Sequence, residues 1–431
     1  MVTKTETFDV CIIGGGPAGL MAAGIAGQKG ARVILLEKNE ILGKKLLISG
    51  GGRCNLTNAN PNHRDFVAKY GKKGNFLFTP FSKFGVPETI KFFNDLGLET
   101  KIEPGFRVFP VSDKSEDVLK TLVNFAKKNN VEFRIGAEVS KFKKTKNKIT
   151  AVVLNNKDGS TKLTTGEITA KSFILATGGK SHPETGSTGD GFVWLKDLGH
   201  TVIDSNPALV PIKIKESWVT DLSGIAIDKA GISVWINENN QYKKVLSKKG
   251  RFLFTHVGLT GPTILNMSKE IGEYLEYGEV KMAIDFFSGV GLDKMHEMML
   301  ETFEKNLNKK IKNLVFPEIP TKVYEIILRQ LEIDGDWPIN DIPRAARLAL
   351  VEKFKRFEMT VSSLLGVDKA VVTSGGVDLS EVDFKTMSSK LFPNLYFAGD
   401  ILDFDRPSGG FSLQLCWTTG YVAGQSISVL K

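Results

Sequence analysis

The sequence predicts a doubly wound α/β fold with a second domain inserted into it. An apolar strand near the N-terminus runs into a glycine-rich turn and then a helix of small residues, which is the start of a βαβ unit. Two further short apolar strands, at residues 173–176 and 394–397, also run into glycines. Between these two strands the pattern changes, from about residue 201 to 365. We therefore expect the first and last parts of the chain to form one domain and the middle part another.

Composition places the chain among ordinary globular proteins. Its 431 residues suggest two or three domains. Its 42% hydrophobic and 24% charged residues exclude a disordered chain, a collagen-like fibre and a disulfide-stapled mini-protein. The formal net charge is +9. Two interpretations of this charge stay open: an anionic partner, such as a nucleotide cofactor or RNA, or a lysine-rich surface that serves solubility.

The first element is a strand, a turn and a helix. Residues 8–13 (FDVCII) predict the strand, and the residues after the turn (LMAAGIAGQKG) predict the helix. The turn has the GxGxxG spacing and reads Gly14-Gly15-Gly16-Pro17-Ala18-Gly19. Gly14 permits the tight turn, Gly16 lets the backbone approach a pyrophosphate, and Gly19 lets the helix lie close to the strand. The phosphates would lie at the helix N-terminus, where free N–H groups and the helix dipole attract anions.

The second element is a strand that ends in an acid. Residues 31–36 (ARVILL) predict the strand, and Glu37 follows it, 18 residues after Gly19. This is the spacing of a carboxylate that binds ribose hydroxyls. Strand, glycines, helix, strand and acid in this order predict a Rossmann-like dinucleotide-binding domain.

Two later strands favour FAD over NAD. Residues 173–176 (FILA) end in Ala176 and continue into Thr177 and Gly178, a pattern typical of flavoproteins where the chain passes the bound FAD. Residues 394–397 (NLYF) precede Gly399 and Asp400. We expect the Asp400 carboxylate at the ribityl or pyrophosphate part of FAD.

The last predicted helix begins at a glycine pair. It follows Gly410 and includes Phe411, Ser412 and the stretch up to about residue 427. The positive end of this helix would point at the flavin pyrimidine and would stabilise the anionic reduced flavin.

Cysteine usage indicates a reducing compartment. The cysteines are Cys11, Cys54 and Cys416, without a CxxC pair, which favours the cytoplasm. Residues 10–28 carry no charge and imitate a membrane segment, but their glycines and the acids before them argue against a span or a signal peptide. We expect a soluble protein with no membrane partner.

Five blocks of sequence resemble the HI0933-like, or BaiN-like, FAD flavoproteins, over nearly the whole chain. They are IIGGGPAGLMAA (12–23), GKKLLISGGGRCNLTN (43–58), ATGGKSHPETGSTGDG (176–191), LFTHVGLTGP (253–262) and LYFAGDILDFDRPSGGFSLQLCWTTGYVAG (395–424). SGGGRCN followed by TN is the most diagnostic. Two positions depart from the family: Asp400 stands where Glu is usual, and Ser412 where Asn is frequent.

The resemblance implies further cofactor contacts. It implies a loop around the FAD pyrophosphate and the flavin edge, made by Lys44, Lys45, Ser49, Gly50, Gly51 and Arg53. Successive glycines offer N–H groups to oxyanions there, and the alternative is a solvated basic loop. It also implies contacts at Lys38, Asn55, Val139 and Asp403, and a backbone turn near the cofactor at residues 185–190.

A histidine is the candidate acid. His256 lies in the fourth block, between a predicted strand (251–254) and a helix that begins at Pro262. It could give a proton at neutral pH, and the alternative is a histidine that bonds backbone at a turn. His182 is the second candidate. Cys54 and Cys416 could form a redox disulfide, although such enzymes normally use a closely spaced pair. No metal-ligand spacing is present.

The predicted domain boundaries follow these elements. Residues 1–200 form the first part of the FAD-binding domain, of the glutathione-reductase or fumarate-reductase type, with a small β-meander at 131–172. Residues 201–365 form the inserted substrate domain, with a β part to about 290 and a helical part from about 291. Residues 366–431 complete the FAD-binding domain. The run KFKKTKNK (141–148) predicts a solvated hairpin tip or an RNA contact.

The resemblance implies an FAD-dependent oxidoreductase, with NAD(P)H as a transient reductant because no second dinucleotide fingerprint exists. Reactions of the family include reduction of C=C bonds conjugated to carbonyls, in oxidised bile acids and in uracil of ribosomal RNA, and oxidation of aminoacetone. In the reductions, hydride from flavin N5 reaches the β-carbon and an acid such as His256 protonates the α-carbon. Among these reactions, the net charge favours dihydrouridine formation in RNA. A small-molecule oxidoreductase and a non-catalytic RNA- or ribosome-binding flavoprotein are the alternatives, and the oligomeric state stays open.

Overall fold

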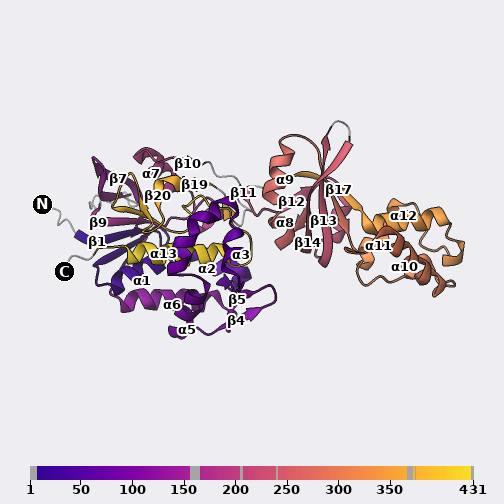
Figure 1. The fold of residues 1–431 in the computed structure, drawn as a ribbon, viewed down its shortest axis with the longest axis horizontal. Helices are drawn as coiled ribbons and strands as arrows, with labels where there is room; N and C mark the ends of the chain where they lie inside the picture. The colour runs from indigo at the N-terminus through magenta and orange to yellow at the C-terminus, as the bar shows by residue number, and fades with distance from the viewer. Residues whose placement is uncertain are drawn as a thin grey trace. The chain divides into compact units, whose positions relative to one another are not determined.

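The computed structural model describes residues 7–155, 166–203, 207–238, 241–365, 372–373 and 375–428. The chain divides into two compact units. The first unit comprises residues 1–207 and 371–431, and the second comprises residues 208–370. Each unit has its own cluster of buried side chains. The fold class predicted from the sequence is confirmed: a Rossmann-like α/β domain is interrupted by an inserted β-plus-helical unit (Figure 1).

The first unit carries the helices and strands of the dinucleotide-binding fold. They are β1 (Thr7–Ile13), α1 (Pro17–Gln28), β2 (Val33–Glu37), α2 (Lys44–Ile48), η1 (Ser49–Gly52), β3 (Thr57–Asn58), α3 (His63–Ala68), η2 (Gly71–Leu77), α4 (Phe78–Lys83), α5 (Val86–Asp95), β4 (Thr100–Glu103), β5 (Arg107–Pro110), α6 (Ser115–Lys128), β6 (Glu132–Ile135), β7 (Val139–Thr145), β8 (Lys148–Leu154), β9 (Glu167–Leu175), η3 (Pro183–Thr185), α7 (Asp190–Leu198), β10 (Val202–Ile203), β19 (Gly376–Val377), η8 (Leu379–Glu381), β20 (Val382–Asp383), β21 (Ser388–Ser389), β22 (Leu395–Phe397) and α13 (Phe411–Gln425).

The central sheet of this unit is mostly parallel. Its order is β20-β21-β22-β9-β1-β2-β6, and β22, β9, β1, β2 and β6 run parallel. The hairpin of β7 and β8 joins the sheet through antiparallel pairing of β8 with β9. Strands β1 and β2 are buried almost throughout because helices cover the sheet, as near-continuous apolar runs require. The carboxyl ends of β1, β2 and β9 therefore meet at one edge of the sheet.

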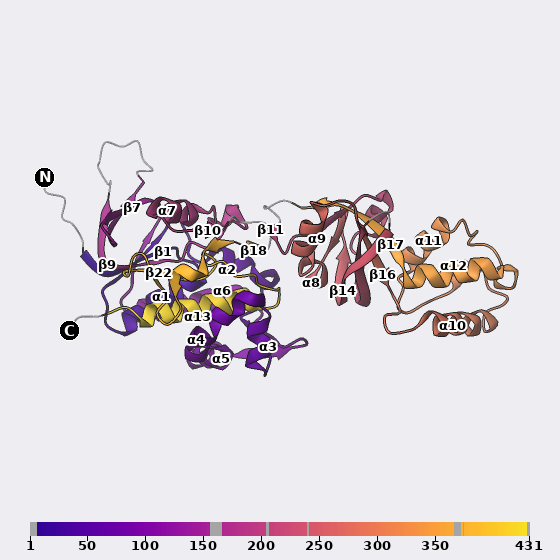
Figure 2. The same ribbon diagram turned by 45° about the horizontal axis from the view of Figure 1, so that its top comes forward.

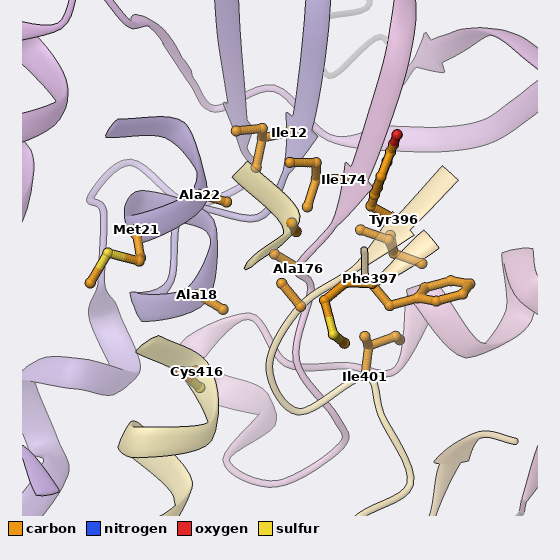
Figure 3. Packing of buried hydrophobic residues seen from close by; sticks show 14 of the residues in the cluster. Ile12, Ala18, Met21, Ala22, Ile174, Ala176, Tyr396, Phe397, Ile401 and Cys416 are labelled. Atoms are coloured by element: carbon orange, nitrogen blue, oxygen red, sulfur yellow. The ribbon is translucent and has the colours of Figure 1, made fainter. Parts of the chain in front are cut away.

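Helices α1 and α13 pack closely because both carry small residues at their contact. A Cβ on Gly420 would lie 2.5 Å from the Ala18 carbonyl oxygen, and one on Gly424 would lie 2.6 Å from that of Ala22. Figure 3 shows Ala18 and Ala22 on α1, with Cys416 of α13 below Ala18 and with Ile12 and Ile174 of the sheet above. This packing brings the start of α1 and the start of the C-terminal helix to the same side of the first unit (Figure 2).

The second unit combines a barrel with a helical part. The barrel is closed in the order β12-β15-β14-β13-β16-β17. The barrel strands and the short helices between them are β12 (Ile212–Ile214), η4 (Ser217–Leu222), β13 (Ala226–Glu238), β14 (Gln241–Phe254), β15 (Gly258–Thr260), α8 (Pro262–Leu265), α9 (Ser268–Leu275), β16 (Val280–Asp285) and β17 (Phe357–Leu364). The helical part consists of α10 (Leu292–Glu304), η5 (Ile311–Asn313), α11 (Thr321–Gln330), η6 (Ile339–Asp341) and α12 (Arg344–Lys355). The short strands β11 (Pro207–Ala208) and β18 (Val372–Thr373) pair with each other.

Candidate functional site

A cleft opens at the carboxyl ends of β1, β2 and β9 in the first unit. The space between its walls measures about 900 Å³ and is partly open to solvent. Its wall is built by the turn before α1, the end of β2, the start of α2 and the loops that follow β9 and β22. Ligands of parallel α/β sheets bind at this edge, where loops from neighbouring strands converge.

Many of the residues predicted to bind the cofactor line this cleft. They are Gly14, Gly16, Pro17, Ala18, Glu37, Lys38, Lys44, Lys45, Val139, Ala176, Thr177, Gly178 and Asp400. Thr185, Gly186, Gly189 and Asp190 of the predicted turn near the cofactor lie there too. The structure thus brings together segments that are up to 386 residues apart in the sequence.

The glycine-rich turn leaves space where a phosphate group would lie. Gly14 has φ +108°, and a Cβ there would lie 2.5 Å from the Ala176 carbonyl oxygen. A Cβ on Gly19 would lie 1.9 Å from the Gly14 carbonyl oxygen, so the helix could not approach the turn. A Cβ on Gly16 would have no heavy atom within 4 Å. Among the described residues, no side chain caps the N-terminus of α1. Gly16 therefore borders open space beside free helix N–H groups, as an anion site requires.

Glu37 organises the turn from the end of β2. Its Oε2 accepts a hydrogen bond from the Gly15 N–H (2.7 Å). Its Oε1 accepts from the N–H (2.8 Å) and the side-chain amide (2.7 Å) of Asn39. The side chain is held in one position at the cleft wall, where the sequence predicts contact with ribose hydroxyls.

Two buried oxygen atoms in the cleft wall lack hydrogen-bond partners among the described residues. They are Thr177 Oγ1 and Asp400 Oδ1. Arg406 Nη1 lies 3.3 Å from Asp400 Oδ1 and forms an ion pair with it, but without hydrogen-bond geometry. Buried polar groups are normally satisfied, and an exception indicates a missing partner. Together with the open space at Gly16, these atoms fit a polar, anionic ligand such as FAD.

Lysines surround the same cleft. The Lys45 ammonium donates to Ser181 Oγ (3.1 Å), and burial lowers the pKa of Lys45, while Asp400 raises it. Lys44 donates to the Glu184 carbonyl oxygen (2.7 Å), and Lys38 pairs with Asp190 (2.7 Å). Lys45 is thus a desolvated cation beside the Asp400 carboxylate, and a bound diphosphate would favour its charged form.

The loop after α2 is engaged with the protein itself. The Arg53 guanidinium bonds Glu103 and Asp113 and stacks over Phe109 (4.1 Å), and the bonds to these two carboxylates raise the pKa of Arg53. Ser49 Oγ donates to the Leu46 carbonyl oxygen. Ser49, Gly50, Gly51, Arg53 and Asn55 are not among the residues that line the cleft. Their contact with the cofactor stays a prediction.

The start of α13 is fixed by neighbouring segments. Gly410 has φ +99°, and a Cβ there would lie 2.5 Å from the Thr57 carbonyl oxygen. Asn55 accepts from the Gly410 N–H (3.2 Å) when its amide is oriented to satisfy its neighbours. Phe411 is buried and stacks on Phe66 (4.8 Å).

Other predicted residues also lie outside the cleft lining. They are Gly15, Gly19, Gly399, Asp403, Gly410, Phe411 and Ser412. Asp403 is buried and pairs with Lys73. A Cβ on Gly399 would lie 2.9 Å from Ala18 Cβ, so this glycine permits the close approach of the Asp400 loop to α1.

The candidate acids lie in different units. His256 is exposed and follows β14 in the second unit, where its carbonyl oxygen accepts from Thr220 Oγ1 (3.3 Å). His182 belongs to the first unit, has φ +52° and bonds Glu184 through Nδ1 (2.9 Å). The role of His256 as an acid stays a prediction.

The cysteines are buried free thiols. Burial raises the pKa of Cys54 to about 12 and raises the pKa of Cys416 as well. A raised pKa suppresses the thiolate that a redox or nucleophilic cysteine needs. Within the residues that the structure describes, no group of side chains could hold a metal ion.

Other residues that line the cleft were not predicted to bind the cofactor. Asn39, Gly43, Ala137, Glu138, Ser187 and Trp194 line the cleft together with Cys416. Asn39 lies two residues after Glu37, so a polar residue following the ribose acid was the available signal.

In the described part of the chain, no helix is long and apolar enough to cross a membrane.

Comparisons with known proteins agree with this geometry. Residues 8–426 match the family model described as HI0933-like protein Rossmann domain. The chain is 30% identical over 419 residues to the 3-dehydro-bile acid delta(4,6)-reductase of Clostridium scindens, covering 96% of this chain and 98% of that protein. It is 28% identical over 434 residues to the ribosomal RNA dihydrouridine synthase of Escherichia coli, covering 99% of both.

Solved structures share the fold. A 3-ketosteroid-delta4-(5alpha)-dehydrogenase from Rhodococcus jostii is similar with a TM-score of 0.53 and 14% identity, covering 99% of this chain and 98% of that chain. A flavocytochrome c3 fumarate reductase is similar with a TM-score of 0.52 and 16% identity, covering 98% of this chain and 78% of that chain.

Proposed function

The chain belongs to the HI0933-like family and is an FAD-dependent oxidoreductase, and we propose that it reduces a C=C bond conjugated to a carbonyl, with uridine of ribosomal RNA as the favoured substrate. Relatives from Escherichia coli and Haemophilus influenzae are named ribosomal RNA dihydrouridine synthase. Reducing uridine to dihydrouridine saturates a double bond conjugated to the C4 carbonyl. NAD(P)H is the proposed reductant, and the cytoplasm the proposed location.

The cleft of the first unit supports the proposal. Its wall combines the open space at Gly16 with buried oxygens of Thr177 and Asp400 that accept no hydrogen bond from the described residues. We assign the pyrophosphate of FAD to the N-terminus of α1, a ribose to Glu37, and the ribityl or pyrophosphate part to Asp400. When bound, FAD supplies the hydride that the β-carbon of the substrate receives. Lys45, the desolvated cation in this wall, would balance the negative charge of the diphosphate.

His256 is the proposed proton donor to the α-carbon. The side chain is exposed and can exchange protons with solvent. Its contribution is a proton that leaves the ring nitrogen as the new C–H bond forms.

Replacing this histidine tests that role. In His256→Gln we expect kcat for uridine reduction to fall about 10²- to 10⁴-fold, because general acid catalysis is lost. FAD content should not change, and the pH–rate profile should lose the limb that requires a protonated acid. His296→Gln, at a half-buried histidine on α10 of the second unit, is the control. A His256→Gln profile identical to the parent profile would exclude His256 as the acid.

The substrate class can be separated from a small-molecule alternative. The Clostridium scindens relative is named a bile-acid reductase, so an enone substrate is the second candidate. Purified protein is incubated with NADPH or NADH and either unmodified ribosomal RNA or a steroid enone. Dihydrouridine in the digested RNA, detected by mass spectrometry, supports the proposal. Nicotinamide oxidation that depends on the enone, while the RNA gains no dihydrouridine, would assign the protein to the second class.

A further inference from the structure

The excess positive charge lies in the first unit. Of the formal +9, residues 1–207 and 371–431 carry +8, and residues 208–370 carry +1. Within the first unit, residues 63–83 hold five basic residues and one acid, Asp65. These residues form α3, η2 and α4. Residues 63–83 thus carry a net charge of +4 within the FAD-binding unit.

Three of these cations are free to meet a partner. Arg64, Lys69 and Lys72 are exposed, and no described carboxylate pairs with them. Lys73 differs, because it pairs with the buried Asp403. Unpaired exposed lysine and arginine side chains attract polyanions such as nucleic acid.

Exposed aromatic rings accompany the cations. Phe76 and Phe78 are 41% and 40% exposed, and Phe106, at the turn between β4 and β5, is 51% exposed. Basic residues interleaved with exposed aromatic rings are the pattern of single-stranded nucleic acid binding, because bases stack on the rings while lysines contact phosphates. We call Arg64, Lys69, Lys72, Phe76, Phe78 and Phe106 the basic–aromatic face.

Phe106 is held in a costly conformation. It has φ +61°, the left-handed region, in a three-residue turn between the paired residues Glu103 and Arg107. Glycine is usual at the left-handed position of such turns, and a bulky residue there is strained. The ring is exposed, so packing in the core does not explain its presence. Strain of this kind at an exposed position indicates a function of the side chain.

Hydrogen bonds connect the α3–η2 segment and the β4–β5 turn to the start of α13, the first directly and the second through Asn58. The Tyr70 hydroxyl, between α3 and η2, donates to the Phe411 carbonyl oxygen (2.8 Å). The Asn58 amide donates to the carbonyl oxygens of Gly105 (3.0 Å) and Gly409 (3.3 Å). These bonds link the face to the start of α13, which the sequence assigns to the flavin pyrimidine.

We propose that the basic–aromatic face docks the single-stranded RNA segment that carries the target uridine. The proposal rests on the RNA substrate proposed above and names the surface that would receive it. Lysine and arginine contact the phosphates, and Phe106 stacks on a base next to the reacting uridine. Bases splayed out of an RNA loop offer such stacking surfaces.

Charge reversal and ring removal test the face separately. Binding of a labelled single-stranded RNA of about ten nucleotides is measured by fluorescence anisotropy on the FAD-loaded full chain. Arg64→Glu/Lys69→Glu/Lys72→Glu should raise Kd at least about tenfold and flatten its salt dependence. The matched control, Lys120→Glu/Lys127→Glu/Lys128→Glu, reverses three exposed charges on α6 and should leave Kd within about twofold of the parent value.

Phe106→Gly separates stacking from folding. Because glycine suits the left-handed position, the melting temperature should stay the same or rise, while Kd rises about fivefold or more. Tyr277→Ala removes another exposed ring, in the second unit, and should change neither quantity. If Phe106→Gly and the charge reversal bind RNA as the parent does, the face is not the RNA surface.

Parallel dihydrouridine assays separate this proposal from the proposed function. If the parent protein forms dihydrouridine and the face variants bind and modify RNA equally well, the face is wrong and the function stands. If the parent protein forms no dihydrouridine but its RNA binding depends on the face, the face stands and the uridine substrate is wrong. If the parent protein does not bind RNA, the face is overturned, and enone-dependent turnover then decides the function.

Discussion

At the scale of single residues, the cleft contains buried oxygen atoms that accept no hydrogen bond from the residues that the structure describes. Thr177 Oγ1 and Asp400 Oδ1 are both buried there. An unsatisfied buried hydroxyl costs roughly 1–3 kcal/mol, and a ligand that bonds it recovers this free energy. Stability of the FAD-free protein and affinity for FAD should therefore respond in opposite directions when such an atom is removed.

Thr177→Val tests whether the stability of the FAD-free protein and the affinity for FAD change in opposite directions. The substitution keeps the shape of the side chain and removes the unpartnered oxygen. We expect the FAD-free protein to melt at the same or a higher temperature, and Kd for FAD to rise about 5- to 30-fold, which corresponds to about 1–2 kcal/mol. Calorimetry and flavin fluorescence titration measure the two quantities. Unchanged FAD affinity would mean that Thr177 does not face the cofactor.

The sequence predicted single residues unevenly. Glu37 and Asp400 could be identified because each follows a strand in a known motif, and both line the cleft. The pairing of Arg53 could not be predicted, because Glu103 and Asp113 are 50 and 60 residues away and no local pattern links them. The contact of Arg53 with phosphate stays a prediction.

At the scale of elements, two glycines of the turn before α1 have different roles. Gly16 borders the space for the ligand, and Gly19 permits the close approach of helix and turn. Gly16 has φ −80° and open space around its Cα, so alanine fits there without strain. A Cβ at Gly19 would clash with the Gly14 carbonyl oxygen. Gly16→Ala should keep the melting temperature of the FAD-free protein and weaken FAD binding, whereas Gly19→Ala should lower the melting temperature. Equal FAD affinity in Gly16→Ala would place the pyrophosphate elsewhere.

A buried histidine joins two other elements and makes stability depend on pH. His200 Nδ1 bonds Glu381 (2.6 Å), and Nε2 bonds Ser389 Oγ (3.1 Å), so the end of α7 is tied to β21. Burial lowers the pKa of His200 below 6.5, although Glu381 opposes the shift. The unfolded chain then binds the proton more readily, so this stabilisation is present above pH 6.5 and is lost as the pH falls through the folded-state pKa.

Thermal unfolding between about pH 7.5 and 5 measures the effect. The melting temperature should fall as the pH decreases through this range, and His200→Asn should fall less steeply although it starts lower. His63→Asn, at an exposed histidine, controls for the general effect of pH. An identical slope in His200→Asn and the parent would show that His200 does not carry the dependence.

Local elements were predicted well, and non-local ones were not. The order β1, α1, β2 was predicted because apolar runs and glycines specify it locally, and the structure places these elements within a few residues of the predicted bounds. The barrel closure could not be predicted, because β12 pairs with β15 and with β17, which begins 145 residues after β12. For this region the sequence predicted a β part without its closure.

At the scale of the whole molecule, each unit has a separate hydrophobic core. The cleft belongs to the first unit alone. Calorimetry should therefore show two transitions, and FAD at about 100 times Kd should stabilise the first unit by about 2.7 kcal/mol and leave the other transition in place. A single transition that shifts as a whole would contradict independent cores.

The central claim is that this cleft holds FAD for the reduction of uridine in ribosomal RNA. The most direct measurement is the dihydrouridine content of ribosomal RNA, by nucleoside mass spectrometry, in a strain that lacks the gene. We predict that one dihydrouridine disappears, that the parent gene restores it, and that a folded Gly16→Ala variant restores it only weakly. Ribosomal RNA with unchanged dihydrouridine in the deletion strain would contradict the claim.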